Sequence, residues 1–126
     1  RLIQANPEQH QPRLPFFACC SRTFRKYQVS IPYKARILGS AAYSFCLAAR
    51  GAAIVSFEAR TKLWDIAGPW LLVTEAGGWI AAHQEIQPFR LRAGIDYANQ
   101  NFATLAAATA DELAKAQVSI LLKPSG

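Results

Sequence analysis

Short apolar runs alternate along the chain with segments in which apolar residues recur at helical spacing. Runs suited to strands lie at 16–20, 34–38, 53–57 and 79–82. Apolar positions 41, 45, 48 and 49 share one helical face, after a natural N-cap at Ser40 and before Gly51. Asp65 is a second candidate N-cap, and Gly77 and Gly78 would end its helix. The pattern predicts helices over 40–50 and 65–77.

The remaining segments complete this alternation. Residues 22–26 are basic and predict a loop or a single turn, and a loop of about twenty residues with Pro88 and Gly94 precedes 102–108. Residues 102–108 are apolar on every side, which fits either a central strand or a buried helix. A short helix is expected over 111–117. The order predicts an α/β layered domain with a mixed, largely buried sheet flanked by helices. The tryptophans, Trp64, Trp70 and Trp79, are expected in its core.

The beginning of the chain differs from the rest. Residues 1–15 are polar and interrupted by proline, so we expect a linker or disordered end there and one α/β domain over 16–126. The 126 residues begin with Arg1 and contain no methionine. We therefore expect a piece of a longer protein.

Composition limits the class of protein. Hydrophobic residues make up 52% and charged residues 17%, which excludes intrinsic disorder, a collagen-like repeat and a heptad coiled coil. No apolar run is long enough for a transmembrane helix, so no membrane partner is expected. Three cysteines cannot all pair, which favours free thiols and a cytoplasmic location. The net charge of +6 favours anionic partners.

Candidate chemistry concentrates between residues 38 and 78. Helix N-termini at Gly39–Ser40 and at Asp65 would present amides to an oxyanion. The carboxylates of Glu58 and Asp65 flank one six-residue loop and are the hard oxygen ligands that Mg²⁺ prefers. Plainer interpretations stay open: Asp65 as a helix cap alone, and Glu58 as a solvated acid at a strand end. Lys62 in that loop contacts phosphate or substrate, or is simply solvated.

Four segments in this order resemble the inositol monophosphatase family. They are Leu38-Gly39-Ser40-Ala41-Ala42, Phe57-Glu58, Trp64-Asp65-Ile66-Ala67-Gly68 and Val73-Thr74-Glu75-Ala76-Gly77-Gly78. The resemblance is good over 34–82 and looser through Ala114. It implies the sugar-phosphatase fold and a Mg²⁺-dependent, Li⁺-sensitive phosphomonoesterase, in which a metal-activated water attacks phosphorus.

The resemblance also implies roles for individual residues. Asp65 would be a Mg²⁺ ligand, and Glu58 would hydrogen-bond a hydroxyl of the released alcohol. Gly39, Ser40 and Ala41 would line the substrate pocket through their backbone. The substrate would be inositol monophosphate or a related sugar or polyol phosphate, and the intact protein would be a homodimer.

Two acidic motifs of the family do not occur in these 126 residues: a Glu-Glu pair and an Asp-Pro-Ile-Asp-Gly-Thr segment. The chain therefore resembles the C-terminal half only. The N-terminal metal-binding half would be its partner, no catalytic residue would lie in this half, and the chain alone would be inactive. Two departures stand out: Pro69 inside the helix of Asp65, and only about thirteen residues between the first two strands, where the family has a helix.

Two other functions compete with this interpretation. The first is a non-catalytic basic module that binds RNA or another anion through the cations of the first third, Arg13, Arg22, Arg25, Lys26, Lys34 and Arg36. Because these cations are not interleaved with stacking aromatics, nucleic acid is the less favoured partner. The second is a functionless half-domain, whose exposed apolar surface would drive self-association.

Overall fold

The computed structural model describes residues 15–84 and 87–124. The linker predicted at 1–15 therefore lies, apart from Pro15, outside the described residues. Within these ranges the elements are, in chain order, β1 (Phe16–Cys19), α2 (Thr23–Lys26), β2 (Tyr27–Val29), β3 (Lys34–Ile37), α3 (Ala41–Ala49), β4 (Ala53–Thr61), α4 (Leu63–Glu75), β5 (Trp79–Ala82), β6 (Phe102–Ala107), α5 (Ala110–Ser119) and β7 (Ile120–Leu122).

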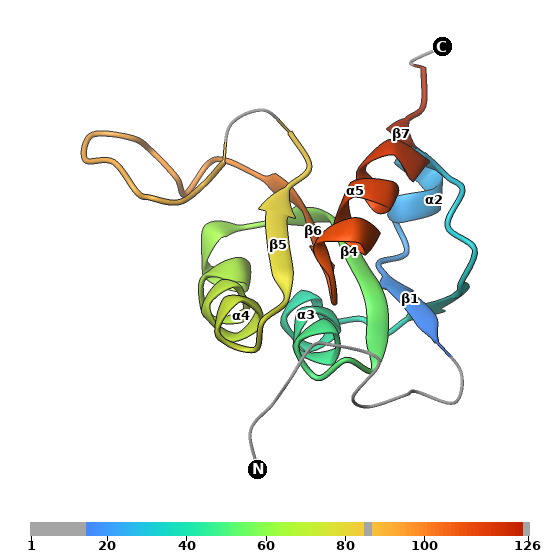
Figure 1. The fold of residues 1–126 in the computed structure, drawn as a ribbon. Helices are drawn as coiled ribbons and strands as arrows, with labels where there is room; N and C mark the ends of the chain where they lie inside the picture. The colour runs from blue at the N-terminus through green and yellow to red at the C-terminus, as the bar shows by residue number, and fades with distance from the viewer. Residues whose placement is uncertain (1–14, 85–86, 125–126) are drawn as a thin grey trace.

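Five strands form one mixed sheet in the order β3-β1-β4-β6-β5. Strand β1 runs parallel to β3 and β4, whereas β6 runs antiparallel to β4 and β5. Figure 1 shows α3 and α4 on one side of this sheet and α5 on the other. The predicted fold class, a mixed sheet flanked by helices, is confirmed.

Alternation along β6 explains the two layers of core. Phe102 and Ala106 pack toward α3 and α4 together with Phe45, Ile66 and Val73. The residues that alternate with them, Ala103, Leu105 and Ala107, belong to the cluster on the α5 side. Successive side chains of a strand point to opposite faces, so a central strand covered on both sides is apolar on both faces. The one polar residue of β6, Thr104, is fully buried, and its hydroxyl donates to the Phe102 carbonyl over 3.2 Å. This resolves the choice left open for 102–108 in favour of a strand.

Several predicted boundaries were wrong. Strand β4 continues to Thr61, into the segment where we expected the loop between Glu58 and Asp65. Helix α4 begins at Leu63 rather than at Asp65, because the Asp65 carboxylate reaches back to the backbone N–H of Lys62 from the third helical position. By contrast, the single turn predicted over 22–26 is confirmed as α2, and the short strand β2 follows it. The helix that the resemblance implies between β1 and β3 is thus reduced to one turn.

The placement of two tryptophans was also wrong. Trp64 is 65% exposed and Trp79 is 52% exposed. The buried stripe of α4 consists of Ile66, Pro69 and Val73, and Trp64 lies off it. Trp79 begins β5, which is an edge strand with a neighbour on one side only. Trp70 is half-buried and packs edge-to-face on Phe89, with ring centroids 4.9 Å apart.

A two-stranded sheet, β2 with β7, was not predicted. It joins Tyr27 to Leu122 and Val29 to Ile120 in antiparallel register. The C-terminal end of the described chain is thereby fixed beside α2, where the N–H of Lys123 donates to the carbonyl of Lys26 over 2.8 Å. This hydrogen bond connects the end of α2 to the residue that follows β7.

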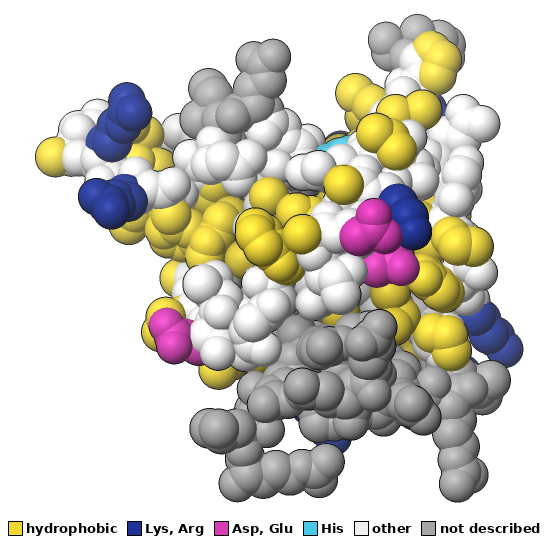
Figure 2. Space-filling view, in the orientation of Figure 1, with side chains coloured by type: hydrophobic (Ala, Val, Ile, Leu, Met, Phe, Trp, Pro, Cys, Tyr) yellow, Lys and Arg dark blue, Asp and Glu magenta, His cyan; other side chains and the backbone are white. Residues whose placement is uncertain are grey.

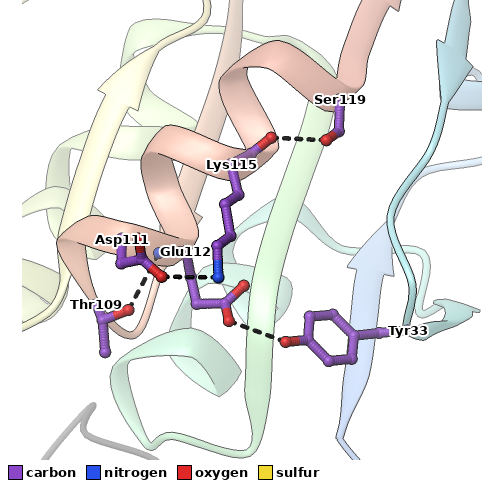
Figure 3. Close-up of polar contacts among 6 residues, drawn as sticks. All are labelled: Tyr33, Thr109, Asp111, Glu112, Lys115 and Ser119. Carbon is purple, nitrogen blue, oxygen red and sulfur yellow. Dashed lines mark hydrogen bonds and ion pairs between the residues drawn. The ribbon is translucent and has the colours of Figure 1, made fainter.

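Side-chain contacts fix α5 at its N-terminus (Figure 3). The Thr109 hydroxyl accepts from the N–H of Glu112 over 3.1 Å, and the Tyr33 hydroxyl donates to the Glu112 carboxylate over 2.9 Å. Lys115 and Asp111 form an ion pair of 2.8 Å one turn apart. Figure 2 shows these acidic and basic side chains together on the surface over α5. The Glu112 contact ties the helix to the segment that precedes β3.

Replacing Thr109 by Ala should lower the free energy of unfolding by about 1 kcal/mol, because an N-cap oxygen satisfies an amide that otherwise has no intrahelical partner. Urea denaturation followed by circular dichroism measures the change. Thr74→Ala is the matched control, since its exposed hydroxyl donates to the Trp70 carbonyl within α4 and caps no helix. An equal loss in both variants would contradict the capping role.

Candidate active site

A cleft of about 670 Å³ opens at the carboxyl ends of the three parallel strands. Crevices at this end of parallel strands are the usual ligand sites of open α/β sheets. Cys19 pairs with Ile37 of β3 and with Phe57 of β4, so the segments that follow the strands emerge side by side. The cleft is lined by Cys20, Ser21, Arg22, Arg25, Ile37, Gly39, Ser40, Ala41, Ala42, Glu58, Arg60 and Asp65.

Asp65 lies half-buried in the first turn of α4 and lines this cleft. Its Oδ2 accepts from the N–H of Lys62 over 2.8 Å, and its own N–H donates to the Lys62 carbonyl over 3.0 Å. These bonds fix the carboxylate and leave Oδ1 without a donor among the described residues. Asp65 therefore caps the helix and still offers one oxygen to a ligand.

Pro69 lies inside α4, which continues to Glu75. Proline has no N–H, so the Asp65 carbonyl four residues earlier loses its intrahelical donor. The side chain of Pro69 is buried on the inner stripe of the helix, beside Ile66 and Val73. Pro69 does not end the helix, and the Asp65 side chain keeps both its cap and its place on the cleft.

The loop between β3 and α3 presents the beginning of a nine-residue helix to the cleft. Gly39 has a φ of 77°, which explains glycine at this turn. Ser40 is the N-cap, as the sequence predicted, and its hydroxyl accepts from the N–H of Tyr43 over 3.3 Å. The amides of this first turn lie at the positive end of the α3 dipole, where an oxyanion is favoured.

Glu58 is a nearly buried carboxyl, 5% exposed, on the face of β4 toward α3. Burial raises its pKa above 4.5, and the charge of Asp65 adds to the rise. The hydroxyl of Ser44 and the thiol of Cys20 offset part of it. Ser44 Oγ itself is buried and makes no close hydrogen bond among the described residues. The cleft therefore holds the Asp65 carboxylate at the start of a helix and the nearly buried Glu58 carboxyl, whose pKa is raised by burial.

This pKa shift predicts a pH dependence of stability. A carboxyl with a raised pKa in the folded state stabilises the fold below its ordinary pKa, and the contribution is lost as the pH rises through the folded-state value. Glu58→Gln cannot ionise, so the variant should become increasingly stable relative to the wild type between about pH 4 and pH 7. Urea titrations at both pH values measure this, with exposed Glu75→Gln as the control. A constant difference between wild type and Glu58→Gln would contradict the shift.

The predicted site residues divide into two groups. Gly39, Ser40, Ala41, Glu58 and Asp65 come together on the cleft. Lys62 does not line it, because its Nζ donates to the Ala98 carbonyl over 3.2 Å in the loop before β6. Three arginines, Arg22, Arg25 and Arg60, also line the cleft. The sequence placed Arg22 and Arg25 only in the alternative RNA-binding module and gave Arg60 no role.

The donor set fits part of a Mg²⁺ site. The free Asp65 oxygen and the Glu58 carboxyl are hard oxygen donors on one cleft. Within 15–84 and 87–124, no three acidic, histidine or cysteine side chains gather closely enough to enclose a metal ion. His83 instead places Nε2 2.7 Å from the Ile120 carbonyl.

Solved structures similar to this chain include inositol monophosphatases. Inositol monophosphatase-II from Staphylococcus aureus superposes with a TM-score of 0.60 over 86% of this chain and 41% of its own, at 14% identity. Mycobacterium tuberculosis SuhB gives 0.56 over 83% and 41%, at 21% identity. The architecture therefore defines the class as the inositol monophosphatase fold.

Sequence comparison gives the family. The model of the inositol monophosphatase family matches residues 5–120, so the chain belongs to that family. Inositol monophosphatase 1 from Bos taurus is 49% identical over 43 residues, which are 34% of this chain and 16% of that protein. The Mus musculus protein is 46% identical over 50 residues, 39% of this chain and 18% of its own. The chain thus covers less than half of the proteins it resembles.

Proposed function

We propose that this chain forms the C-terminal half of a Mg²⁺-dependent phosphomonoesterase that acts on inositol monophosphate or a related sugar or polyol phosphate. The observation that carries the proposal is the convergence of Asp65, Glu58 and the Gly39–Ala41 turn on one cleft. Family membership supports the reaction class.

Each residue has a defined task on this proposal. Asp65 holds Mg²⁺ through the oxygen that the helix cap leaves free. The amides of Gly39, Ser40 and Ala41 hold substrate oxygens. Glu58 forms a hydrogen bond with a hydroxyl of the alcohol that leaves, and its nearly buried position fixes the carboxyl for that bond. Mg²⁺, when bound, supplies positive charge to the phosphoryl oxygens in the transition state.

The remaining metal ligands would come from an acidic N-terminal half outside these 126 residues. The structural relatives extend well beyond the matched region, since the chain covers 41% of them. Exposed apolar side chains also support a further contact surface: Trp64, Leu71 and Leu72 on α4, and Trp79 on β5. On this proposal the isolated chain is inactive, and the intact protein is a cytoplasmic homodimer.

Among the described residues, no helix has the length and apolar character needed to cross a bilayer.

The test is release of inorganic phosphate from inositol 1-phosphate. The longer polypeptide that contains this chain should release phosphate only when Mg²⁺ is present, and the 126-residue chain alone should release none. Metal-independent release, or no release by the longer polypeptide, would overturn the proposal. A labelled RNA in a salt titration tests the alternative function, since phosphate-driven binding weakens steeply as salt rises.

A further inference from the structure

The cleft has a basic side that the proposed reaction does not use. Arg22, the N-cap residue of the turn α2, and Arg25 within it lie three positions apart and both line the cleft. Residues three apart on a helical turn are neighbours on one face, which agrees with both side chains lining the same cleft. Arg60, on β4, also lines the cleft, but its Nε donates to Asn101 over 3.3 Å.

Neither Arg22 nor Arg25 has an anionic partner within the described part of the chain. The ion pair found there joins Lys115 to Asp111 on α5. The carboxyl groups of the cleft, Glu58 and Asp65, lie on β4 and on the first turn of α4. A cleft with three arginines and two carboxyl groups carries excess positive charge. An unpaired guanidinium is a strong, often bidentate donor to phosphate or carboxylate.

The turn that carries these arginines is held in place on both sides. Thr23 is fully buried, its N–H donates to the Cys20 carbonyl over 3.1 Å, and its hydroxyl contacts the Cys20 thiol at 3.3 Å. On the other side, Lys123 Nζ donates to the Phe24 carbonyl over 2.5 Å. A fixed turn lowers the ordering cost of binding. Lys26, on the same turn, does not line the cleft.

We propose that Arg22 and Arg25 form a subsite for a second oxyanion group of the substrate, a phosphate or a carboxylate at the far end of a phosphorylated polyol. The proposal rests on the proposed function, which uses the Asp65 side of the cleft for the phosphate that is hydrolysed. A volume of about 670 Å³ lies in the range of small-molecule sites and has room for a six-carbon polyol.

The test compares three ligands of one carbon skeleton on the 126-residue chain without divalent cations: glucitol 6-phosphate, 6-phosphogluconate and glucitol 1,6-bisphosphate. Titration calorimetry at fixed ionic strength gives each Kd. The wild type should bind the bisphosphate roughly tenfold more tightly than the monophosphate, a difference of about 1.4 kcal/mol. If 6-phosphogluconate also binds more tightly than the monophosphate, the subsite accepts a carboxylate as well as a phosphate. If only the bisphosphate binds more tightly, the subsite selects phosphate.

Three variants with the same change of net charge locate the effect. Arg22→Gln and Arg25→Gln should each remove most of the preference, whereas Lys26→Gln should keep it. Circular dichroism verifies the fold of each variant. An equal loss in all three variants, or no preference in the wild type, overturns the subsite. If the wild type prefers the bisphosphate but the longer polypeptide shows no Mg²⁺-dependent hydrolysis, the proposed function is contradicted and the subsite is not. If the longer polypeptide hydrolyses its substrate but the wild type shows no preference for the bisphosphate, the subsite is contradicted and the proposed function is not.

Discussion

Replacing Asp65 by Asn should lower Mg²⁺-dependent phosphate release by the longer polypeptide at least about 100-fold. Loss of a residue that only supports a metal ligand already costs 10- to 100-fold, and Asp65 is proposed as the ligand itself. An amide oxygen carries no charge and holds Mg²⁺ more weakly than a carboxylate. The measurement is initial phosphate release from inositol 1-phosphate across a Mg²⁺ titration.

The fold should survive this substitution. The side-chain amide oxygen that Asp65→Asn introduces can still accept from the N–H of Lys62, so the free energy of unfolding should change by less than about 1 kcal/mol. Glu75→Gln, at the exposed end of the same helix, removes one negative charge and should keep full activity. Activity of Asp65→Asn within a few-fold of wild type would contradict the metal-ligand role.

Replacing Phe57 by Ala should lower the free energy of unfolding by about 3–5 kcal/mol. Phe57 is fully buried on β4 and meets Tyr27 and His83 edge-to-face, with ring centroids 5.0 and 5.4 Å away. The expected loss is a large share of the roughly 5–15 kcal/mol that stabilises a typical domain. Because Phe57 precedes Glu58 on the strand, the same cavity should loosen the site.

Urea denaturation followed by circular dichroism measures this loss. Phe24→Ala is the matched control, because this phenylalanine of α2 is 43% exposed and the change should cost much less. A loss below about 1 kcal/mol in Phe57→Ala would contradict the central position of β4 in the core.

The fold was largely predictable because its central elements carry local patterns. The helix after Ser40 has a cap, an apolar face and a glycine end, and the structure confirms it as α3. Residues 102–108 were ambiguous, since a strand covered on both faces loses the alternation that identifies it. The pairing of β2 with β7 depends on residues more than ninety positions apart, about which local pattern carries no information.

The acidic part of the site was predictable for a different reason. Glu58 and Asp65 stand at a spacing that resembles the family, and both lie on the cleft. The sequence did not predict that Arg22 and Arg25 lie on this cleft, because their place there depends on β1 lying beside β4 in the sheet, which the sequence order does not reveal. Lys62 is close to Asp65 in sequence, yet its ammonium group turns to the Ala98 carbonyl in a distant loop.

The central claim is that the free oxygen of Asp65 binds a divalent cation. A crystal structure of the longer polypeptide with Mn²⁺ tests it most directly, because Mn²⁺ takes the same oxygen ligands and its anomalous signal locates the ion. The account predicts a peak about 2.1 Å from Asp65 Oδ1, with the helix-cap bond to Lys62 intact. A bound Mn²⁺ whose ligands do not include Asp65, or no ion in this cleft at saturating Mn²⁺, would contradict it.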